Sequence, residues 1–206
     1  MANTNRVGAG ARPVKHMTGA PYNGQFNLYE IPAADSTNTA VGDFVIVDQT
    51  AGTERYSTCI RAAASGQVTN VTATPLLGVI VGFVVDPTNL DTPQYRALST
   101  KRIAMVADAP DLIFEIQDGG TVPCTWTLIG MNTGITATAV TAATGASNMA
   151  TGTTAPAGTI NLPLRVVGIV DSPDNESPTV AGQAYQKLHV MINTHRYGSS
   201  AGSTGY

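Results

Sequence analysis

Short hydrophobic runs separated by turn-forming residues dominate the chain, and they predict an all-β protein. The runs are rich in Val, Ile, Leu, Phe and Tyr, and Gly, Pro, Asn and Asp bound them, as expected for strands and turns. No long segment repeats apolar residues at helical spacing. We expect strands at 26–31, 43–48, 56–62, 77–85, 101–107, 112–117, 160–170 and 187–193. Such short strands without intervening helices predict a β-sandwich, or a jelly-roll-like or barrel-like body.

Turn residues support the same strand boundaries. Asp86-Pro87, Ala109-Pro110 and Asp118-Gly119 each follow a hydrophobic run and are suited to turns. Pro163 lies inside the expected strand 160–170 and has no amide proton to give to a ladder. We therefore expect an edge position or a β-bulge at Pro163.

The two ends of the chain differ from the middle. Residues 1–25 contain Arg6, Arg12 and Lys15, no acidic residue and no strand pattern, so we expect an extended N-terminal arm that becomes ordered on a partner. A disordered leader is the alternative. Residues 26–197 are expected to form a single β-rich domain, since a chain of 206 residues suits one all-β domain. Residues 198–206 are rich in Gly and Ser and are expected to be a mobile tail.

Composition and charge exclude several classes of function. Charged residues make up 12% of the chain, about half the usual share of roughly 25%. The net charge of −3 lacks the basic excess that binding to a phosphate backbone requires, so we expect no nucleic-acid partner. The longest apolar run, Leu76–Val85, is half the length of a membrane-spanning helix, so we expect a buried strand and no membrane partner. No apolar secretion signal is visible at the start.

The stretch from Gly119 to Leu164 contains no Asp, Glu, Lys, Arg or His and is crowded with Thr, Ala and Gly. Neutral hydroxyls cost less to bury than charges when they are hydrogen-bonded, so such a stretch suits a protein–protein contact. We interpret it as part of an oligomer or partner interface. A solvated Thr-rich loop is the alternative.

Candidate chemistry is sparse. Cys59 and Cys124 show no metal or disulfide spacing and are expected to be buried thiols. His189 and His195 would lie too far apart on one strand to share a metal. The Gly198–Gly202 segment matches GxSxG without the strand and helix that a nucleophile elbow needs.

Acidic residues cluster at two places in the chain, and we interpret them as turn-forming carboxylates. The turns at 108–111 and 172–175 fit side-chain caps of backbone amides. A calcium site in the second cluster or a glycosidase pair are the alternatives. The clusters are Asp108, Asp111, Glu115 and Asp118, and Asp171, Asp174 and Glu176. We expect no cofactor, no metal and no catalytic residue.

Several phrases spread over nearly the whole chain resemble one family, the capsid cement (decoration) proteins of tailed bacteriophages. The phrases are DAPDLIFEIQ at 108–117, LRVVG at 164–168, PDNE at 173–176, INTHRY at 192–197, RPV at 12–14 and PYNGQ at 21–25. They are mostly turns and strand ends, so they indicate kinship and fold, and they assign no reaction.

The resemblance implies a non-enzymatic virion protein that binds the outer surface of a capsid and stabilises contacts between capsomers. Its partners would be the major capsid protein and copies of itself in a homotrimer, and it would be made in the host bacterial cytoplasm. We expect Arg6, Arg12, Lys15 and Tyr22 to contact a neighbouring subunit, and Trp126 to fill the core or an interface.

Two other classes of function remain open. A head-fibre or glycan-binding decoration module would use Trp126 or Tyr95 as a stacking platform. A hydrolase on a β scaffold would require a deep pocket with paired carboxylates.

Overall fold

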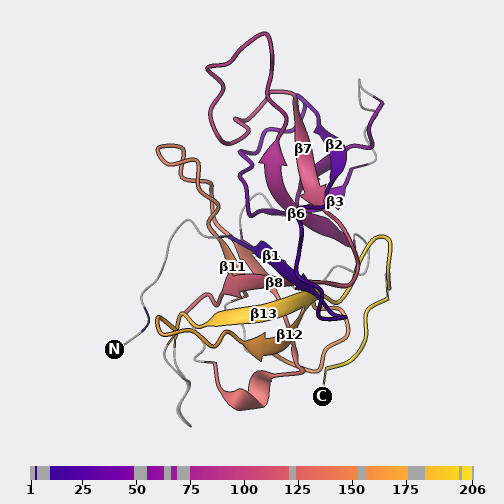
Figure 1. Cartoon of the computed structure of the whole chain (residues 1–206), viewed down its shortest axis with the longest axis vertical. Coiled ribbons are helices and arrows are strands. Elements are labelled where there is room, and N and C mark those ends of the chain that lie inside the picture. Colours follow the sequence, from indigo (N-terminus) through magenta and orange to yellow (C-terminus); the bar gives the residue numbers. More distant parts are fainter. Residues whose placement is uncertain are drawn as a thin grey trace.

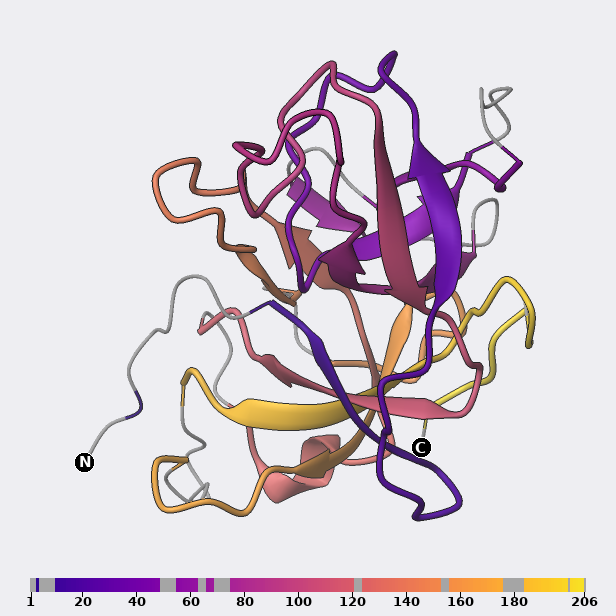
Figure 2. The same ribbon diagram turned by 45° about the horizontal axis from the view of Figure 1, so that its top comes forward.

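The described part of the chain forms three antiparallel β-sheets and one short 3-10 helix, as the computed structural model shows (Figures 1 and 2). The structure describes residues 3, 10–48, 55–62, 66–68, 75–120, 124–152, 156–175, 184–199 and 201–205. The predicted all-β class with a sandwich-like body is therefore confirmed. All eight strands expected from the sequence are present. The strand at 112–117 has the expected bounds, whereas those expected at 56–62 and 160–170 are limited to Cys59–Arg61 and Leu164–Ile169.

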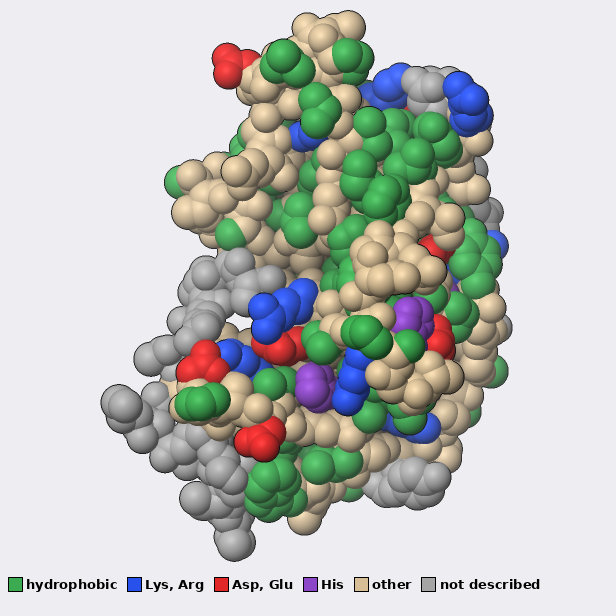
Figure 3. All heavy atoms as spheres, in the orientation of Figure 1, with side chains coloured by type: hydrophobic (Ala, Val, Ile, Leu, Met, Phe, Trp, Pro, Cys, Tyr) green, Lys and Arg blue, Asp and Glu red, His purple; other side chains and the backbone are tan. Residues whose placement is uncertain are grey.

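The first sheet forms the lower layer in Figure 1. Its strands in spatial order are β1 (Arg12–His16), β8 (Leu112–Gln117), β13 (Lys187–Ile192), β12 (Leu164–Ile169) and β9 (Asn132–Thr133). Charged side chains gather over β1, β8 and β13 on its outer face (Figure 3). Two of these side chains, Arg12 and Glu115, form an ion pair and are partners across the β1–β8 ladder.

The second sheet forms the upper layer and curls into a small barrel. Its strands in spatial order are β2 (Asn27–Ile31), β7 (Arg102–Ala107), β6 (Leu76–Phe83), β3 (Phe44–Val47) and β4 (Cys59–Arg61). The two outer strands meet, because Glu30 on β2 forms a parallel bridge with Thr58 beside β4, and the Glu30 amide donates to the Ser57 carbonyl at 2.9 Å. Inside this barrel lies a core of Tyr29, Ile31, Val45, Cys59, Leu77, Ile80, Ala104 and Val106.

A third sheet of short strands lies beside the other two and comprises β11 (Met149–Thr151), β10 (Ile135–Ala137) and β5 (Gly66–Val68). Beyond β10 and before β11 the chain makes a hairpin that projects from the body in both views (Figures 1 and 2). Strands β10 and β11 and the helix η1 (Trp126–Leu128) lie in the charge-free stretch, of which 121–123 and 153–155 fall outside the described residues.

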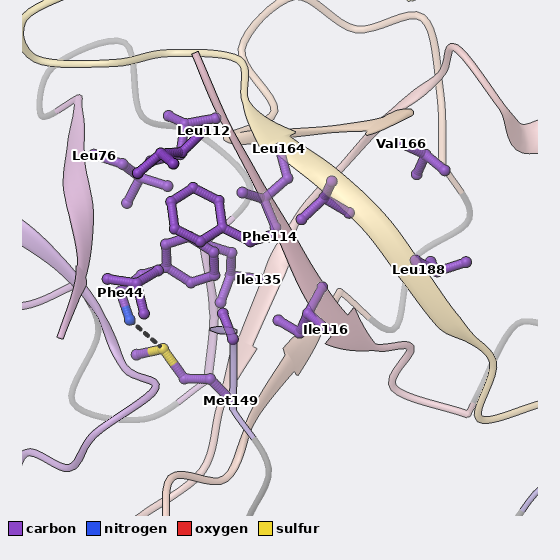
Figure 4. Packing of buried hydrophobic residues seen from close by; sticks show 14 of the residues in the cluster. Phe44, Leu76, Leu112, Phe114, Ile116, Ile135, Met149, Leu164, Val166 and Leu188 are labelled. Carbon is purple, nitrogen blue, oxygen red and sulfur yellow. Dashed lines mark hydrogen bonds between the residues drawn. The ribbon is translucent and has the colours of Figure 1, made fainter. Parts of the chain in front are cut away.

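One hydrophobic cluster joins all three sheets. Phe44 of the barrel packs edge-on against Phe114 of β8, with ring centroids 5.8 Å apart. Met149 of the third sheet completes the contact, because its Sδ accepts a hydrogen bond from the Phe44 amide at 3.1 Å (Figure 4). Alternation places the other side chains of β3 and β6 in the barrel core, so the same strands serve both cores.

The ends of the chain differ from the prediction. Residues 12–16 of the expected arm form β1, which pairs with β8, so this part belongs to the body. The strand was missed because Pro13, Lys15 and His16 mask the alternation, and a register shift between Pro13 and Lys15 interrupts it. The expected mobile tail is held at Ser203, whose carbonyl accepts from Asn132 and Arg165, each at 2.8 Å.

Pro163 also differs from its predicted place. Strand β12 begins at Leu164, so Pro163 lies directly before the strand and not inside it. Its carbonyl accepts the Asn193 amide at 2.8 Å, which continues the pairing with the β13 side without needing a proline N–H.

Candidate functional site

A hollow of about 650 Å³ lies next to the end of β1, and we call it the aromatic hollow. Its volume falls in the range of roughly 300–1,000 Å³ that is usual for ligand sites. Aromatic and neutral polar side chains dominate its lining. The lining residues are His16, Tyr22, Gln25, Phe26, Asn27, Tyr29, Asp108, Ala109, Pro110, Leu112 and Tyr197.

A tight return after β1 places Tyr22 in the wall. The His16 amide donates to the Ala20 carbonyl at 2.8 Å, and Gly19 sits in the turn with a φ of 92° that favours glycine. The Tyr22 amide then donates to the Val14 carbonyl at 2.9 Å, which brings the chain back beside β1. The Tyr22 hydroxyl donates to the Gln25 carbonyl at 2.8 Å, and partial burial raises the pKa of Tyr22.

Asp108, just after β7, forms the polar floor. Its carboxylate accepts the Asn27 side-chain amide at 2.9 and 3.0 Å and the Tyr29 hydroxyl at 2.6 Å. Burial and then the bond to Asp108 raise the pKa of Tyr29, so this hydroxyl stays protonated and donates. This role corrects the prediction that Asp108 caps backbone amides, because its partners here are side chains from β2.

The loop after β13 supplies Tyr197. Its amide donates to His195 Nδ1 at 3.0 Å, and burial lowers the pKa of His195, so the imidazole is neutral and accepts. The hydroxyls of Tyr197 and Tyr29 are 3.4 Å apart. Two side chains at the rim stay exposed, Tyr197 at 57% and Phe26 at 45%.

His16 and Asp111 form an ion-pair geometry at one side of the hollow, with Nδ1 3.1 Å from both carboxylate oxygens. The two acidic groups near the hollow are thus engaged, Asp108 by Asn27 and Tyr29, and Asp111 by His16. No Ser, Cys or Lys is among the lining residues that the structure describes.

A second hollow of about 520 Å³ lies on the other side of Phe26, where Arg55 and Tyr56 contribute to its lining. Both hollows share Phe26, Asn27 and Tyr29. The exposed Phe26 ring therefore stands between two depressions.

The site residues expected from the sequence do not form one cluster. Tyr22 lines the aromatic hollow, whereas Arg12 and Lys15 lie on β1, where the Arg12 Nη2 is 2.8 Å from the Glu115 carboxylate. Trp126 lies on η1 next to β9, at the opposite edge of the first sheet from β1. Arg6 lies outside the described residues.

The alternative stacking platform, Tyr95, lines a smaller hollow of about 260 Å³ near Asp86 and Arg102.

Four residues of the site were missed at the sequence level: Phe26, Asn27, Tyr29 and Tyr197. A signal did exist, because Tyr22, Phe26 and Tyr29 are closely spaced in a segment with few other large side chains. Tyr197 and Asp108 could not be joined to this segment from the sequence, since they reach it through tertiary contacts.

Three exposed apolar side chains belong to segments that flank β9, and we call this set the apolar edge. It consists of Trp126, Ile129 and Ile160, with exposed fractions of 54%, 41% and 39%. Residues 157–160 lie beside β9, because Asn132 bridges Ala157 and its side-chain amide donates to the Thr159 carbonyl at 3.1 Å. All three apolar side chains belong to the charge-free stretch.

Other candidate chemistry has a structural explanation. Cys59 and Cys124 are free and buried, as predicted, and burial raises the pKa of each thiol to about 12. Within the described ranges, no group of three His, Cys, Asp or Glu side chains is arranged to hold a metal ion. Across the same ranges, no helix has the length and apolarity needed to cross a membrane.

The remaining acidic residues also differ in role. Asp174 accepts hydrogen bonds from the Ser172 hydroxyl and the Lys187 ammonium group. Glu176 lies outside the described residues. Ser200, the centre of the GxSxG match, also lies outside them. Asp118, which was expected in a turn, accepts the backbone amides of Gly120 and Gln186.

Neither a family model, nor a curated protein, nor a solved structure matches this chain.

Proposed function

We propose that the chain is a non-enzymatic structural protein of a tailed-phage virion that binds the outside of the capsid and stabilises contacts between capsomers. Two features support the proposal: the resemblance of the phrases at 108–117 and 192–197 to capsid cement proteins, and the apolar edge. The major capsid protein and further copies of the chain, in a homotrimer, would be its partners.

The observation that carries the proposal is the exposure of Trp126 within a charge-free stretch. Large aromatic side chains are enriched at the energetic centre of protein contacts, and charged residues are depleted there. At the apolar edge a partner would bury Trp126, Ile129 and Ile160 without desolvating a charge of that stretch.

Contacts of this kind suit a shell protein. Contacts between exposed ions weaken with salt over a screening length of about 10 Å at 0.1 M, whereas apolar burial does not. Many copies of a modest contact on one shell then add up through multivalency.

A pelleting assay with shells of the major capsid protein tests the proposal. We expect the chain to co-sediment with the shells and to raise their resistance to heat. Trp126→Ser should lower occupancy about ten-fold or more, as loss of a central aromatic contact does. Leu90→Ser removes another exposed apolar side chain, 78% exposed in the loop after β6, and should bind like the unmodified chain.

Point variants are needed to measure the contribution of the basic residues to shell binding. Deleting residues 1–20 would remove β1 from its sheet, so reduced binding after that deletion would not isolate a contact role. Arg12→Ala and Lys15→Ala keep the strand, and weaker shell binding by either variant would support the role of this side. Equal binding by Trp126→Ser and the unmodified chain would contradict the proposal as a whole.

A second candidate, a head-fibre or glycan-binding decoration module on the virion surface, is favoured by the aromatic hollow. Its exposed rings and hydrogen-bonding floor are of the kind that small ligands occupy. The two candidates differ in their readout, because loss of a cement protein weakens shells and loss of a glycan binder alters adsorption to cells.

A further inference from the structure

We propose that the aromatic hollow binds a neutral saccharide chain, with Phe26 and Tyr197 as its stacking surfaces. This inference gives the second candidate function a site and a ligand class, and it does not depend on capsid binding. It also moves the recognition surface away from Trp126 and Tyr95, the platforms expected from the sequence.

Two exposed aromatic rings at the rim are suited to stacking on saccharide rings. Phe26 and Tyr197 remain half-exposed at the rim, outside the two buried apolar clusters. Saccharide rings present a flat face of C–H groups beside a belt of hydroxyls. An aromatic ring covers such a face well, because it offers a large rigid apolar area with little loss of side-chain entropy.

The polar groups of the hollow are suited to hydrogen bonds with saccharide hydroxyls. The Tyr29 hydroxyl donates a hydrogen bond to Asp108, and the Tyr22 hydroxyl donates one to the Gln25 carbonyl. The Tyr22 oxygen is therefore left as an acceptor. The side chains of Asn27 and Gln25 add amide groups that both donate and accept. Such a set matches hydroxyl groups, which themselves donate and accept.

The lack of unpaired charged side chains in the lining favours a neutral ligand. No Lys or Arg is among the described lining residues, and the His16 imidazole is engaged by Asp111, so a phosphate or sulfate would find no unpaired cationic side chain in this lining. The Asp108 carboxylate already accepts three hydrogen bonds, and Asp111 is paired with His16. A cationic ligand would therefore meet acidic groups that are largely satisfied.

The position of the hollow makes it testable on its own. It lies at the β1 side of the first sheet, while Trp126 and Ile129 lie at the β9 side. A variant of the hollow should therefore leave shell binding through the apolar edge unchanged, and failure of one proposal does not imply failure of the other.

The test uses the full chain with maltohexaose, cellohexaose, chitohexaose and a mannan hexasaccharide as probes, each titrated to about 10 mM because single-site saccharide contacts are weak. Calorimetry gives the affinity, and proton–nitrogen correlation spectra locate the site. We expect at least one probe to bind and to shift the amide signals of residues 22–29, 108 and 197. Binding by none of the probes, or shifts confined to the Trp126 or Tyr95 regions, would overturn the proposal.

Matched aromatic variants complete the experiment. Phe26→Ala and Tyr197→Ala should each lower the affinity about five-fold or more, which is the size expected for a lost ring contact. Trp126→Ala and Tyr95→Ala remove aromatic rings elsewhere and should leave the affinity unchanged. Far-ultraviolet circular dichroism checks that all four variants are folded.

A cationic probe distinguishes the remaining chemistry. Tetramethylammonium chloride should not shift the signals of the hollow at concentrations where the saccharide does. Binding of tetramethylammonium without binding of any hexasaccharide would reassign the hollow to cations and overturn the saccharide proposal.

Discussion

The guanidinium of Arg61 and the carboxylate of Asp43 meet at 2.8 Å with both side chains almost completely buried. Asp43 also accepts the Ser147 hydroxyl at 2.6 Å and the Ala40 amide at 2.8 Å, and Arg61 donates to the Thr138 carbonyl at 2.8 Å. Asp43 and Arg61 belong to the barrel layer, whereas Thr138 and Ser147 flank the projecting hairpin. This network therefore attaches the hairpin to the barrel.

Removal of one member of this pair should be strongly destabilising. Arg61→Ala would leave the Asp43 carboxylate buried without its counter-charge, and we expect a loss of about 3–5 kcal/mol in the free energy of unfolding. Arg12→Ala is the matched control, because the Arg12–Glu115 pair has an arginine that is 70% exposed, and it should cost about 1 kcal/mol or less. Urea denaturation measures both, and equal losses would contradict the structural role of the buried pair.

The pH dependence of stability should report on Asp118. Burial raises the pKa of this carboxyl to about 6 from an ordinary value of 3.8. Because the folded state holds the proton more tightly than the unfolded state, the stabilising contribution is complete below pH of about 4 and is lost as the pH rises through about 6. The loss should amount to roughly 2–3 kcal/mol.

Asp118→Asn isolates that contribution. Asparagine cannot titrate, so the variant should show a smaller fall in stability between pH 4 and 7 than the unmodified chain. Guanidinium denaturation at several pH values gives the comparison, and identical pH profiles for the two proteins would remove Asp118 as the cause.

Gly78 should not tolerate a methyl group. A Cβ at this position of β6 would lie 2.2 Å from the Ala107 carbonyl oxygen, which is backbone and cannot move aside. We expect Gly78→Ala to destabilise the protein by about 1–3 kcal/mol. Gly168→Ala on β12 is the control, since a Cβ there meets nothing within 4 Å, and thermal unfolding should show little change or a small gain.

The ring of Phe114 should contribute much more to the free energy of unfolding than the ring of Phe26. Phe114 is fully buried where three sheets meet, so Phe114→Ala should cost about 3–5 kcal/mol. Phe26→Ala should cost about 1 kcal/mol or less because its ring is half-exposed. The unfolding curves by Trp126 fluorescence and by circular dichroism should coincide if the shared cluster makes the chain one unit, and separated curves would show that it does not.

The sequence predicted the β class and the long strands because the alternating or continuous apolar pattern of segments such as 76–83 and 112–117 reflects their burial directly. It missed β1, β5, β9, β10 and β11. Four of these have two or three residues, too short for a period to show, and β1 carries a proline and a register shift.

The candidate site was predictable only in part. Tyr22 was singled out, and it does line the aromatic hollow. Asp108 was assigned to a turn because its neighbours Ala109 and Pro110 are typical of one. Its bonds to Asn27 and Tyr29 span about eighty positions of sequence, and no local pattern records such a contact.

The closure of the upper sheet by the bridge between Glu30 and Thr58 limits how copies of the chain can join there. A sheet with open edges can grow by adding the strand of a neighbour, which leads to fibres that do not stop. At this bridge the Glu30 amide already donates to the Ser57 carbonyl, so a neighbour that approaches there meets side chains more readily than free backbone groups. Recognition by side chains depends on shape and residue type, and it favours assemblies of defined size over open-ended stacking.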